Sequence, residues 1–419
     1  MKILIIHQYF LQKNESGGSR WNEIAKMWGE MGHEVTVIGG MVHYSTGIKD
    51  PRFKNKFVYK EDYEKNVEVF RTHVSEAYNV NFLGRLWGYF SFVFSSIYCG
   101  LFKLSGKYDA IVVSSPPLFI GITGIVLSKL KRIPLFFEIR DLWPESAIDT
   151  GVVTNKFVIK LAYWLEKKIY ETSKHIIVLT PAFKEKLISL KSVRSEKISY
   201  FPNAADFSIS EKYIGKFRID DFRDLNGIPK DKLVITYVGA HGVANNLIQL
   251  IETANLLKDF PVFFLLIGDG MEKKMLMEEA QKLNLTNLKF LPPVSKEEVF
   301  KFIIASDIGT SVLKKVDTFK TVYSNKTFDY MGCKKPILMA IDGISKDLVE
   351  QANAGLFVEP ENPMDFAEKI KVYLNHPELI IEHGNSGYKF AKSNFDRGVL
   401  GANYIDKISS ILKKITTKA

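Results

Sequence analysis

Charged residues follow directly after an apolar run at 134–137. Segment 138–145 reads Glu-Ile-Arg-Asp-Leu-Trp-Pro-Glu and holds three acids and one arginine within eight residues. Burying so many charges is costly unless they serve a purpose, so Arg140, Asp141 and Glu145 are candidates for acid–base chemistry. The alternative is that Arg140 and Asp141 pair only to shape the loop.

Segment 323–331 places a lysine and an aspartate where both could face one ligand. Ser324 or Asn325 is expected to cap a helix whose first turn carries Lys326. Lys326 and Asp329 are three residues apart and therefore share a helix face. A lysine with free amides at a helix start suits a diphosphate, and a carboxylate one turn later suits ribose hydroxyls. The alternative is an exposed ion pair between these two residues.

Three glycine-containing loops each stand between an apolar run and a helical pattern. They are Gly17-Gly18-Ser19-Arg20, the segment 238–246 and Gly268-Asp269-Gly270. Glycines let the backbone approach a ligand, and free N–H groups at a helix start attract anions, but ordinary turns use the same residues. His241 either donates to a phosphate or is only a loop histidine, and Asp269 either belongs to the site or caps the next helix. The candidate anion-binding residues of these loops are Gly17, Gly18, Arg20, Gly239, His241, Gly242, Asn246, Gly268 and Asp269.

An α/β fold must position these segments, because apolar β-branched runs alternate with helical patterns along most of the chain. The strands predicted in the first half are 3–6, 35–38, 67–71, 110–114, 135–139, 175–179 and 198–201, and those in the second half are 233–238, 262–267, 288–291, 308–312 and 336–341. Such alternation predicts parallel sheets with helices on both faces, which bind ligands outside the carboxyl ends of their strands. Segment 208–232 is rich in charge and has no sustained period, so it is expected to be a linker.

The composition restricts the classes of partner. The 419 residues carry 57 Lys and Arg against 47 Asp and Glu, a formal net charge of +10. This excess suits nucleic acid, an anionic membrane or a phosphorylated small molecule. No nucleic-acid, metal-binding or serine hydrolase motif is present, so neither nucleic acid nor a bound metal is expected. The two cysteines, Cys99 and Cys333, cannot build a disulfide scaffold, which favours a reducing compartment.

Two segments indicate contact with a membrane surface. Segment 86–102 is rich in Phe, Tyr and Trp, but it is short and interrupted for a bilayer span, so a buried or interfacial helix is expected. Segment 156–174 sets lysines beside an apolar stripe at helical spacing. This pattern is typical of a helix on anionic lipid, and equally of a helix that covers a sheet. We expect any membrane binding to be driven by charge and not by insertion.

The chain resembles the GT-B glycosyltransferases of family 4 over nearly its whole length. Its first half is similar to the L-fucosamine transferase-like branch of bacterial surface-polysaccharide biosynthesis. The motifs of the first half are Gly17-Gly18-x-Arg20, Gly32-His33-Glu34-Val35, Ser114-Ser115-Pro116-Pro117-Leu118 and Arg140-Asp141-Leu142-Trp143-Pro144-Glu145. Those of the second half are Gly268-Asp269-Gly270, Ser324-Asn325-Lys326 and Gly355-Leu356-Phe357-Val358.

This resemblance implies an α/β chain with two Rossmann-like doubly wound domains that face an interdomain cleft. Residues 1–210 would form the acceptor-side domain and 211–395 the nucleotide-sugar-binding domain, and a C-terminal helix in 396–419 would pack back toward the first domain. Members of the family transfer a sugar from a nucleotide diphosphate with retention at the anomeric carbon. They need no metal, and no other cofactor is implied.

The resemblance also implies roles for particular residues. Asp141 would orient or deprotonate the acceptor, with Arg140 and Glu145 beside it. The donor would contact the glycine loops together with Ser324, Asn325, Lys326 and Asp329. The family usually has two glutamates in the donor site, separated by seven residues, and in this chain the first position holds Thr321 and the second holds Asp329. The Arg and Lys that commonly grip the diphosphate are not evident in the loop of His241 and Asn245, so Lys326 would take over their work.

The sequence therefore predicts a cytoplasmic glycosyltransferase at the inner face of the cell membrane, peripherally associated with an anionic membrane surface. It would move a UDP-linked amino or deoxy sugar onto a lipid-linked saccharide acceptor. One alternative is a non-hydrolysing nucleotide-sugar 2-epimerase, which would need no acceptor. The other is a non-catalytic subunit that binds the membrane or a partner transferase.

Overall fold

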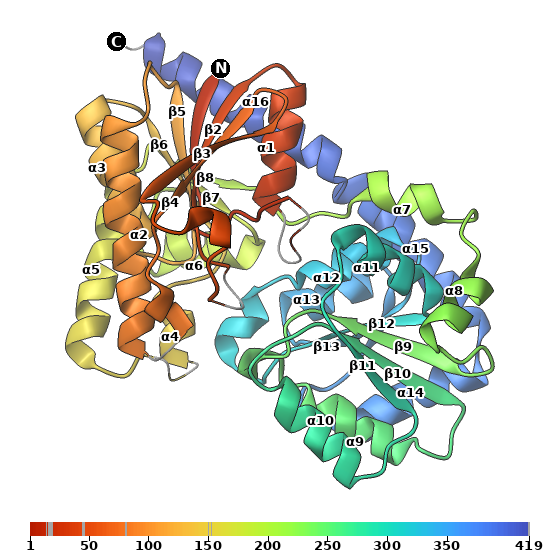
Figure 1. Cartoon of the computed structure of the whole chain (residues 1–419). Coiled ribbons are helices and arrows are strands. Elements are labelled where there is room, and N and C mark those ends of the chain that lie inside the picture. The colour runs from red at the N-terminus through yellow and green to blue at the C-terminus, as the bar shows by residue number, and fades with distance from the viewer. Residues whose placement is uncertain are drawn as a thin grey trace. The chain divides into compact units, whose positions relative to one another are not determined.

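The computed structural model describes residues 1–13, 15, 20–43, 47–79, 82–149, 151 and 153–417. The chain forms two compact units, each built on its own sheet (Figure 1). The first unit comprises Met1–Pro202 and Gly398–Ala419, and the second comprises Asn203–Arg397. The second unit thus begins at Asn203 and not at residue 211, because helix α7 (Phe207–Tyr213) belongs to it.

The first unit has an eight-stranded sheet with the strand order β3-β4-β2-β1-β5-β6-β7-β8. Neighbouring strands are parallel except for β3 and β4. The strands are β1 (Lys2–Ile6), β2 (Glu34–Gly40), β3 (Val58–Glu64), β4 (Val67–Thr72), β5 (Ala110–Ser115), β6 (Leu135–Ile139), β7 (His175–Val178) and β8 (Ile198–Tyr200). The sequence did not predict β3, which is an antiparallel edge strand, largely charged, with Tyr63 as its buried residue.

Helices cover the sheet of the first unit. They are α1 (Arg20–Glu30), α2 (Phe82–Phe102), α3 (Ile120–Lys131), α4 (Glu145–Asp149), α5 (Lys156–Thr172), α6 (Pro181–Ser189) and α16 (Arg397–Thr416), with 3-10 turns η1 (Pro51–Phe53), η2 (Glu76–Asn79) and η3 (Ser195–Lys197). Helix α16 closes the core of this unit: the Tyr404 ring stacks on Phe201 at 4.7 Å, and the Trp28 indole donates to the Gly401 carbonyl at 3.0 Å.

The second unit has a six-stranded, fully parallel sheet with the order β11-β10-β9-β12-β13-β14. Its strands are β9 (Leu233–Val238), β10 (Val262–Ile267), β11 (Leu288–Leu291), β12 (Ile308–Val312), β13 (Ile337–Ala340) and β14 (Gly355–Phe357). Besides α7, its helices are α8 (Ile219–Asn226), α9 (Ile248–Leu256), α10 (Lys273–Lys282), α11 (Lys296–Ala305), α12 (Asn325–Gly332), α13 (Ile344–Gln351), α14 (Pro363–Asn375) and α15 (Glu378–Asn394), with 3-10 turns η4 (Val243–Asn245) and η5 (Asp317–Thr321).

The expected linker at 208–232 is wrong, because helices α7 and α8 occupy much of it. Phe207 packs into the core of the second unit. Arg223 of α8 is buried, and it donates to the Ala305 carbonyl at 2.7 Å and to the Asp307 carboxylate at 2.9 Å. These partners lie far along the chain, so no local pattern in the sequence could have reported them.

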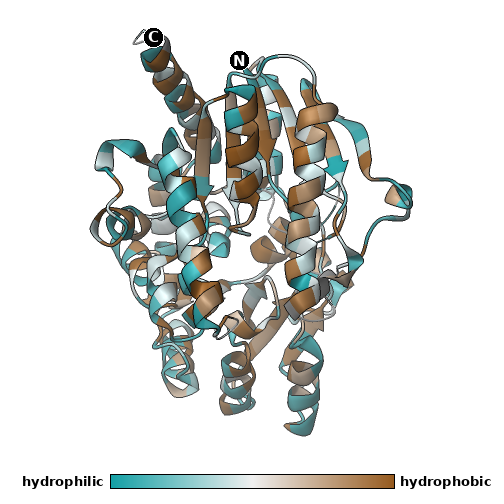
Figure 2. Ribbon diagram, turned by 90° about the vertical axis from the view of Figure 1, so that its left-hand side faces the viewer, coloured by the Kyte–Doolittle hydropathy of each residue, from teal (hydrophilic) through white to brown (hydrophobic). Residues whose placement is uncertain are grey.

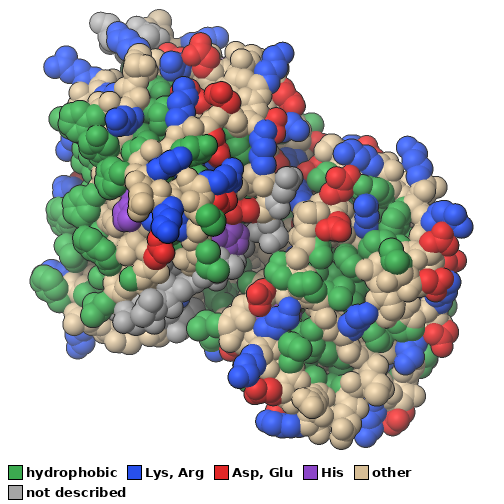
Figure 3. Space-filling model, viewed as in Figure 1, with side chains coloured by type: hydrophobic (Ala, Val, Ile, Leu, Met, Phe, Trp, Pro, Cys, Tyr) green, Lys and Arg blue, Asp and Glu red, His purple; other side chains and the backbone are tan. Residues whose placement is uncertain are grey.

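Helices α2, α3 and α5 form one side of the first unit, and hydrophobic residues gather on its surface. Figure 2 turns this side toward the viewer and shows long hydrophobic stretches on its helices. In Figure 3 hydrophobic side chains lie along the left-hand edge of the same unit. Among the described residues, no helix is both long and apolar enough to cross a membrane.

Candidate functional site

In the first unit, polar side chains meet at the carboxyl ends of β1, β5 and β6. His7 follows β1, and its Nδ1 lies 3.3 Å from the Ser114 carbonyl oxygen. Arg140 follows β6, and its Nη1 lies 3.3 Å from His7 Nε2. A guanidinium only donates, so Nε2 accepts and the proton of this ring is on Nδ1. Burial, aided by Arg140, lowers the pKa of His7 to about 3, so His7 is neutral at physiological pH. His7 was not predicted as a site residue from the sequence, although its position directly after the first strand was a signal.

Asp141 lies one residue beyond Arg140 and is only partly buried. The Ser146 hydroxyl donates to its carboxylate at 2.9 Å. Burial raises the pKa of Asp141 to about 6, against the opposing hydrogen bonds from Ser146 and from the Leu142 backbone. A carboxylate with this pKa is ionised at pH 7 yet a better base than an ordinary aspartate. The geometry therefore leaves Asp141 suited to accept a proton.

Glu145 is engaged elsewhere. Lys191 donates to it at 2.5 Å and to Glu166 at 2.8 Å, and the same ammonium lies 4.3 Å from the centre of the Tyr163 ring. This cluster joins helices α4 and α5 to the chain after α6. The contacts give Glu145 a structural role, in contrast to the catalytic role suggested by its nearness to Asp141 in the sequence.

Glu138 is a buried charged residue near the carboxyl end of β6. It is fully buried in β6, and it accepts hydrogen bonds from the Trp21 indole at 2.9 Å and the Ser114 hydroxyl at 3.0 Å. Arg20 forms a 3.1 Å ion pair with it and also donates to the carbonyls of Phe201 and Pro202. Arg20, predicted to bind the donor, is thus committed to a buried ion pair and to the backbone after β8. Gly17 and Gly18 lie outside the described residues.

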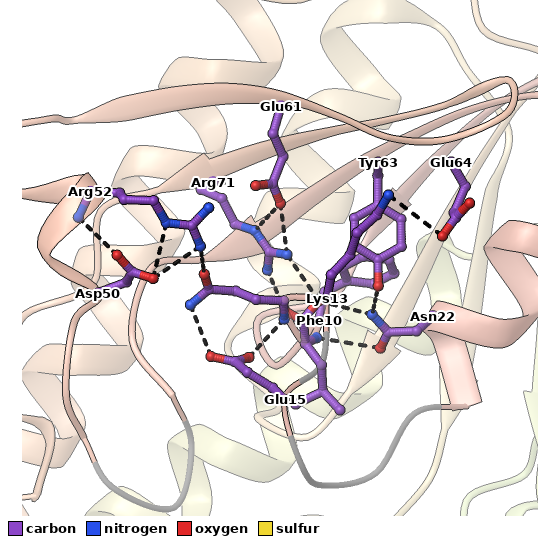
Figure 4. Close-up of polar contacts among 12 residues, drawn as sticks. Phe10, Lys13, Glu15, Asn22, Asp50, Arg52, Glu61, Tyr63, Glu64 and Arg71 are labelled. Carbon is purple, nitrogen blue, oxygen red and sulfur yellow. Dashed lines mark hydrogen bonds and ion pairs between the residues drawn. The ribbon is translucent and has the colours of Figure 1, made fainter. Parts of the chain in front are cut away.

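The segment that follows His7 is held by a polar network, shown in Figure 4. Buried Arg71 of β4 donates to the Glu61 carboxylate at 2.9 Å, to the Leu11 carbonyl at 2.9 Å and to the Phe10 carbonyl. Asn22 of α1 donates to the Leu11 carbonyl at 2.9 Å as well. The backbone beside the His7–Arg140 pair is therefore fixed by two elements of the sheet and by the first helix.

In the second unit, the loops after β9 and β10 pack backbone to backbone. Gly239 N–H donates to the Ile267 carbonyl at 2.9 Å, and His241 N–H donates to the Asp269 carbonyl at 2.8 Å. A Cβ on Gly268 would lie 1.9 Å from the Gly239 oxygen. One on Gly270 would lie 2.4 Å from the His241 oxygen, so the close approach of the loops requires glycine at both positions.

Among the residues that the structure describes, the side chain of Asp269 accepts a hydrogen bond only from the neighbouring Gly270 N–H, at 2.9 Å. Helix α10 begins after Glu272 without a side-chain cap, so the expectation that Asp269 caps it is wrong. Asn246 donates to Glu361 at 3.1 Å and thereby ties its loop to the segment after β14. Gly242 is in extended backbone, and the nearest side chain to a Cβ placed there would be Asn245 at 3.9 Å.

His241 is fully buried, and neither of its ring nitrogens has a hydrogen-bond partner in the described structure. Its ring lies 6.0 Å from those of Tyr237 and Phe290. Burial, together with Lys273, lowers the pKa of His241 to about 4. Buried polar atoms without partners are rare and call for an explanation such as a bound ligand or water. This side chain therefore remains a candidate for donor binding.

Lys326 is the cation of the second candidate site. Its helix α12 begins after Ser324, whose hydroxyl donates to Ser311 at 3.3 Å instead of capping the helix, and Asn325 is exposed. The Lys326 ammonium lies 4.8 Å from the centre of the Tyr237 ring, and a Cβ on Gly239 would lie 3.2 Å from its Cε. The side chain thus reaches the carboxyl end of β9.

Lys326 and Asp329 are ionisable residues that lack ionic partners in the described structure and have shifted pKa values. Neither side chain forms an ion pair or hydrogen bond with any described residue, so the expected exposed ion pair between them is wrong. Burial lowers the pKa of Lys326 to about 8, although Asp329 raises it. Burial likewise raises the pKa of Asp329 to about 7. A half-buried lysine without an anionic partner, beside a glycine loop, is ready to bind an anionic ligand.

Comparison with known proteins gives matches over both units. A model described as "Glycosyl transferase 4-like domain" matches residues 17–204, and one described as "Glycosyl transferases group 1" matches residues 218–390. The chain is 25% identical over 318 residues to the putative colanic acid biosynthesis glycosyl transferase WcaI of Escherichia coli K12, covering 75% of this chain and 77% of that protein.

Solved structures share the fold at low sequence identity. HepE of Anabaena in complex with UDP covers 98% of this chain and 100% of its own, with a TM-score of 0.70 and 19% identity. WaaG, a glycosyltransferase involved in lipopolysaccharide biosynthesis, covers 97% of this chain and 99% of its own, with a TM-score of 0.70 and 16% identity.

The two doubly wound units share the GT-B fold with these solved structures. The two family models add the activity, because the chain carries a glycosyl transferase 4-like domain followed by a group 1 glycosyl transferase domain. The chain belongs to the family 4 GT-B glycosyltransferases.

Proposed function

We propose that this enzyme transfers a UDP-linked amino or deoxy sugar, with retention at the anomeric carbon, to a lipid-linked glycan of surface-polysaccharide biosynthesis. The half-buried Lys326, which has no anionic partner, carries the donor half of the proposal. Solved complexes of HepE with UDP and with UDP-glucose support a nucleotide-sugar donor, and the name of WcaI supports a polysaccharide product.

In the proposed mechanism the second unit binds the donor and the first unit binds the acceptor. Lys326 and the loop amides near Gly239 stabilise the negative charge that develops on the leaving diphosphate. Asp141 takes the proton of the acceptor hydroxyl as its oxygen attacks the anomeric carbon on the same face that the diphosphate leaves. We propose that no bound metal or other cofactor takes part.

We also propose that the enzyme works in the cytoplasm, at the inner face of the cell membrane. The charge of the chain supports this location, since its excess of Lys and Arg favours an anionic leaflet. A lipid-linked acceptor would be presented at that surface.

Lys326→Ala is expected to weaken UDP binding by about 1.5–3 kcal/mol, the value of a hydrogen bond to a charged group. Asp329→Asn should weaken it less. Titration calorimetry with UDP measures both effects. Lys371→Ala is the matched control, because that ammonium also lies over an aromatic ring, 5.3 Å from the centre of Phe260, but on helix α14. Unchanged UDP affinity in both site variants would contradict the assignment of Lys326 and Asp329 to donor binding.

The lowered pKa of Lys326 predicts that UDP binding depends on pH. The ammonium form is needed to bind the diphosphate, so affinity should fall as the pH rises past about 8. Binding favours the charged form, and the complex should therefore take up protons near pH 8. Calorimetry in buffers of different ionisation enthalpy measures this uptake, which should disappear in Lys326→Ala. Proton release in the wild type would contradict the assignment.

A further inference from the structure

Helix α2 is apolar on its outward side as well as on its inward side, where Phe92, Val93 and Cys99 are buried together with serines. Ser95 and Ser96 are fully buried: Ser95 donates to the His73 carbonyl at 2.7 Å, and the Ser96 hydroxyl lies 2.8 Å from that of Thr123 in α3. Trp87 and Phe94, in contrast, are 55% and 60% exposed. A surface helix normally turns its apolar side to the core. The outward side of α2 is therefore suited to an apolar environment.

The exposed hydrophobic residues of α2 form one stripe, because they follow one another at intervals of four or seven residues. Helix α5 has a shorter stripe of the same kind. Helix α3 packs between the two helices, with Gly100 of α2 against Leu127 and Gly121 against Ile169 of α5. We call these side chains together the aromatic face: Leu83, Trp87, Phe94, Tyr98, Phe102, Phe157, Leu161 and Trp164.

The charges around the aromatic face are mostly positive. The basic residues of the three helices are Arg85, Lys129, Lys131, Lys156, Lys160, Lys167 and Lys168. Their two acids are Glu166, which is buried and paired with Lys191, and Glu171, which pairs with Lys168 at 2.7 Å. Two such faces from two copies of the chain would repel each other, whereas anionic lipid would attract them.

We propose that the aromatic face inserts into the interfacial layer of an anionic bilayer, with α2 and α5 lying along the membrane surface. This inference rests on the proposed peripheral association and deepens it. Lysines bring the protein to the leaflet, and burial of the aromatic rings then holds it there. Insertion replaces the expectation that charge alone drives binding.

The aromatic surface continues from α2 to the candidate catalytic loop. Phe119, just before α3, has its ring 5.9 Å from that of Tyr89 in α2 and 6.2 Å from that of Trp143. Trp143 stands two residues after Asp141. An acceptor anchored in the bilayer by its lipid would therefore meet apolar rings along the route to Asp141.

The test is flotation of the full chain with vesicles of phosphatidylcholine containing phosphatidylglycerol. Binding should persist at about 0.5 M NaCl, where the Debye length is only roughly 4 Å and charge attraction is screened. The double variant Trp87→Ser and Phe94→Ser should bind about tenfold more weakly or worse, since each aromatic ring buries a large apolar area. In the wild type, brominated lipid should quench tryptophan fluorescence, and Trp87→Phe with Trp164→Phe should remove most of that quenching.

The control is Leu225→Ser, which removes a side chain that is 86% exposed on α8 in the second unit. It should leave flotation unchanged. Equal flotation of the double variant, or loss of all binding at high salt, would overturn insertion. A dimer in sedimentation that the double variant abolishes would assign the face to a second copy instead. UDP calorimetry without vesicles should be unaffected by the double variant, and failure of UDP binding in the wild type would count against the donor site alone.

Discussion

Replacing Glu138 by alanine is expected to destabilise the first unit by about 3–5 kcal/mol, the cost of removing one partner from a buried ion pair. Glu138 is fully buried, and its partner Arg20 is itself largely buried. Without the carboxylate, the guanidinium would keep its charge in a poorly solvated place, and the Trp21 and Ser114 donors would lose their acceptor. The free energy of unfolding, followed by denaturant titration of the buried tryptophans Trp21 and Trp28, measures the loss.

Glu34→Ala is the matched control for this prediction. Glu34 also pairs with a basic residue of the first unit, Lys2 at 3.5 Å, but its side chain is 71% exposed. An exposed pair of this kind contributes about 0–1 kcal/mol, so the control should barely move the unfolding transition. A Glu138→Ala variant as stable as the control would mean that Arg20 finds another partner, and the structural role assigned to this pair would then be wrong.

The sequence allowed the fold class to be predicted because its signals are local. Apolar runs such as 110–113 and 262–267 are buried on both faces of parallel sheets, so their hydrophobicity is continuous and easy to recognise. Strand β3 was not predicted because an edge strand needs few buried residues, so its sequence lacks an apolar run. Helices α7 and α8 were not predicted because their apolar contacts and the Arg223 hydrogen bonds involve residues far along the chain.

The candidate site likewise has features that the sequence predicts locally and features that only the structure shows. Lys326 and Asp329 could be predicted to share a helix face from their spacing alone, but their burial and lack of an ion pair required the structure. The charges of segment 138–145 looked alike in the sequence. The fold separates them, since Glu138 pairs with Arg20 and Glu145 pairs with Lys191, whereas burial raises the pKa of Asp141 to about 6.

Asp141→Asn is expected to lower turnover by about two orders of magnitude or more, the usual size of acid–base assistance. The amide keeps the shape of the carboxylate but cannot take a proton from the acceptor. In the wild type, kcat/KM should rise with pH through about 6, because burial raises the pKa of Asp141 to about 6, and it should fall again only above about 8, where Lys326 loses its charge. The variant should lose this rise along with its rate. Initial rates measured across the pH range give both results.

The stability of the same variant separates catalysis from folding. The pKa of Asp141 is raised by burial from its ordinary 3.8 to about 6, so the folded state favours the protonated carboxyl. The stability that this group contributes is complete below pH 3.8 and is lost as the pH rises through 6. Asparagine is neutral throughout, and the melting temperature of Asp141→Asn at pH 8 should therefore equal or exceed that of the wild type. Ser146→Ala is the companion variant: loss of its hydrogen bond should raise the pKa of Asp141 further and shift the rise in kcat/KM to higher pH without abolishing turnover. A lower melting temperature in Asp141→Asn, together with the rate loss, would contradict the catalytic assignment. Burial makes the ionised Asp141 carboxylate costly for the folded state, so removing its charge should not destabilise the protein unless the residue has a structural role.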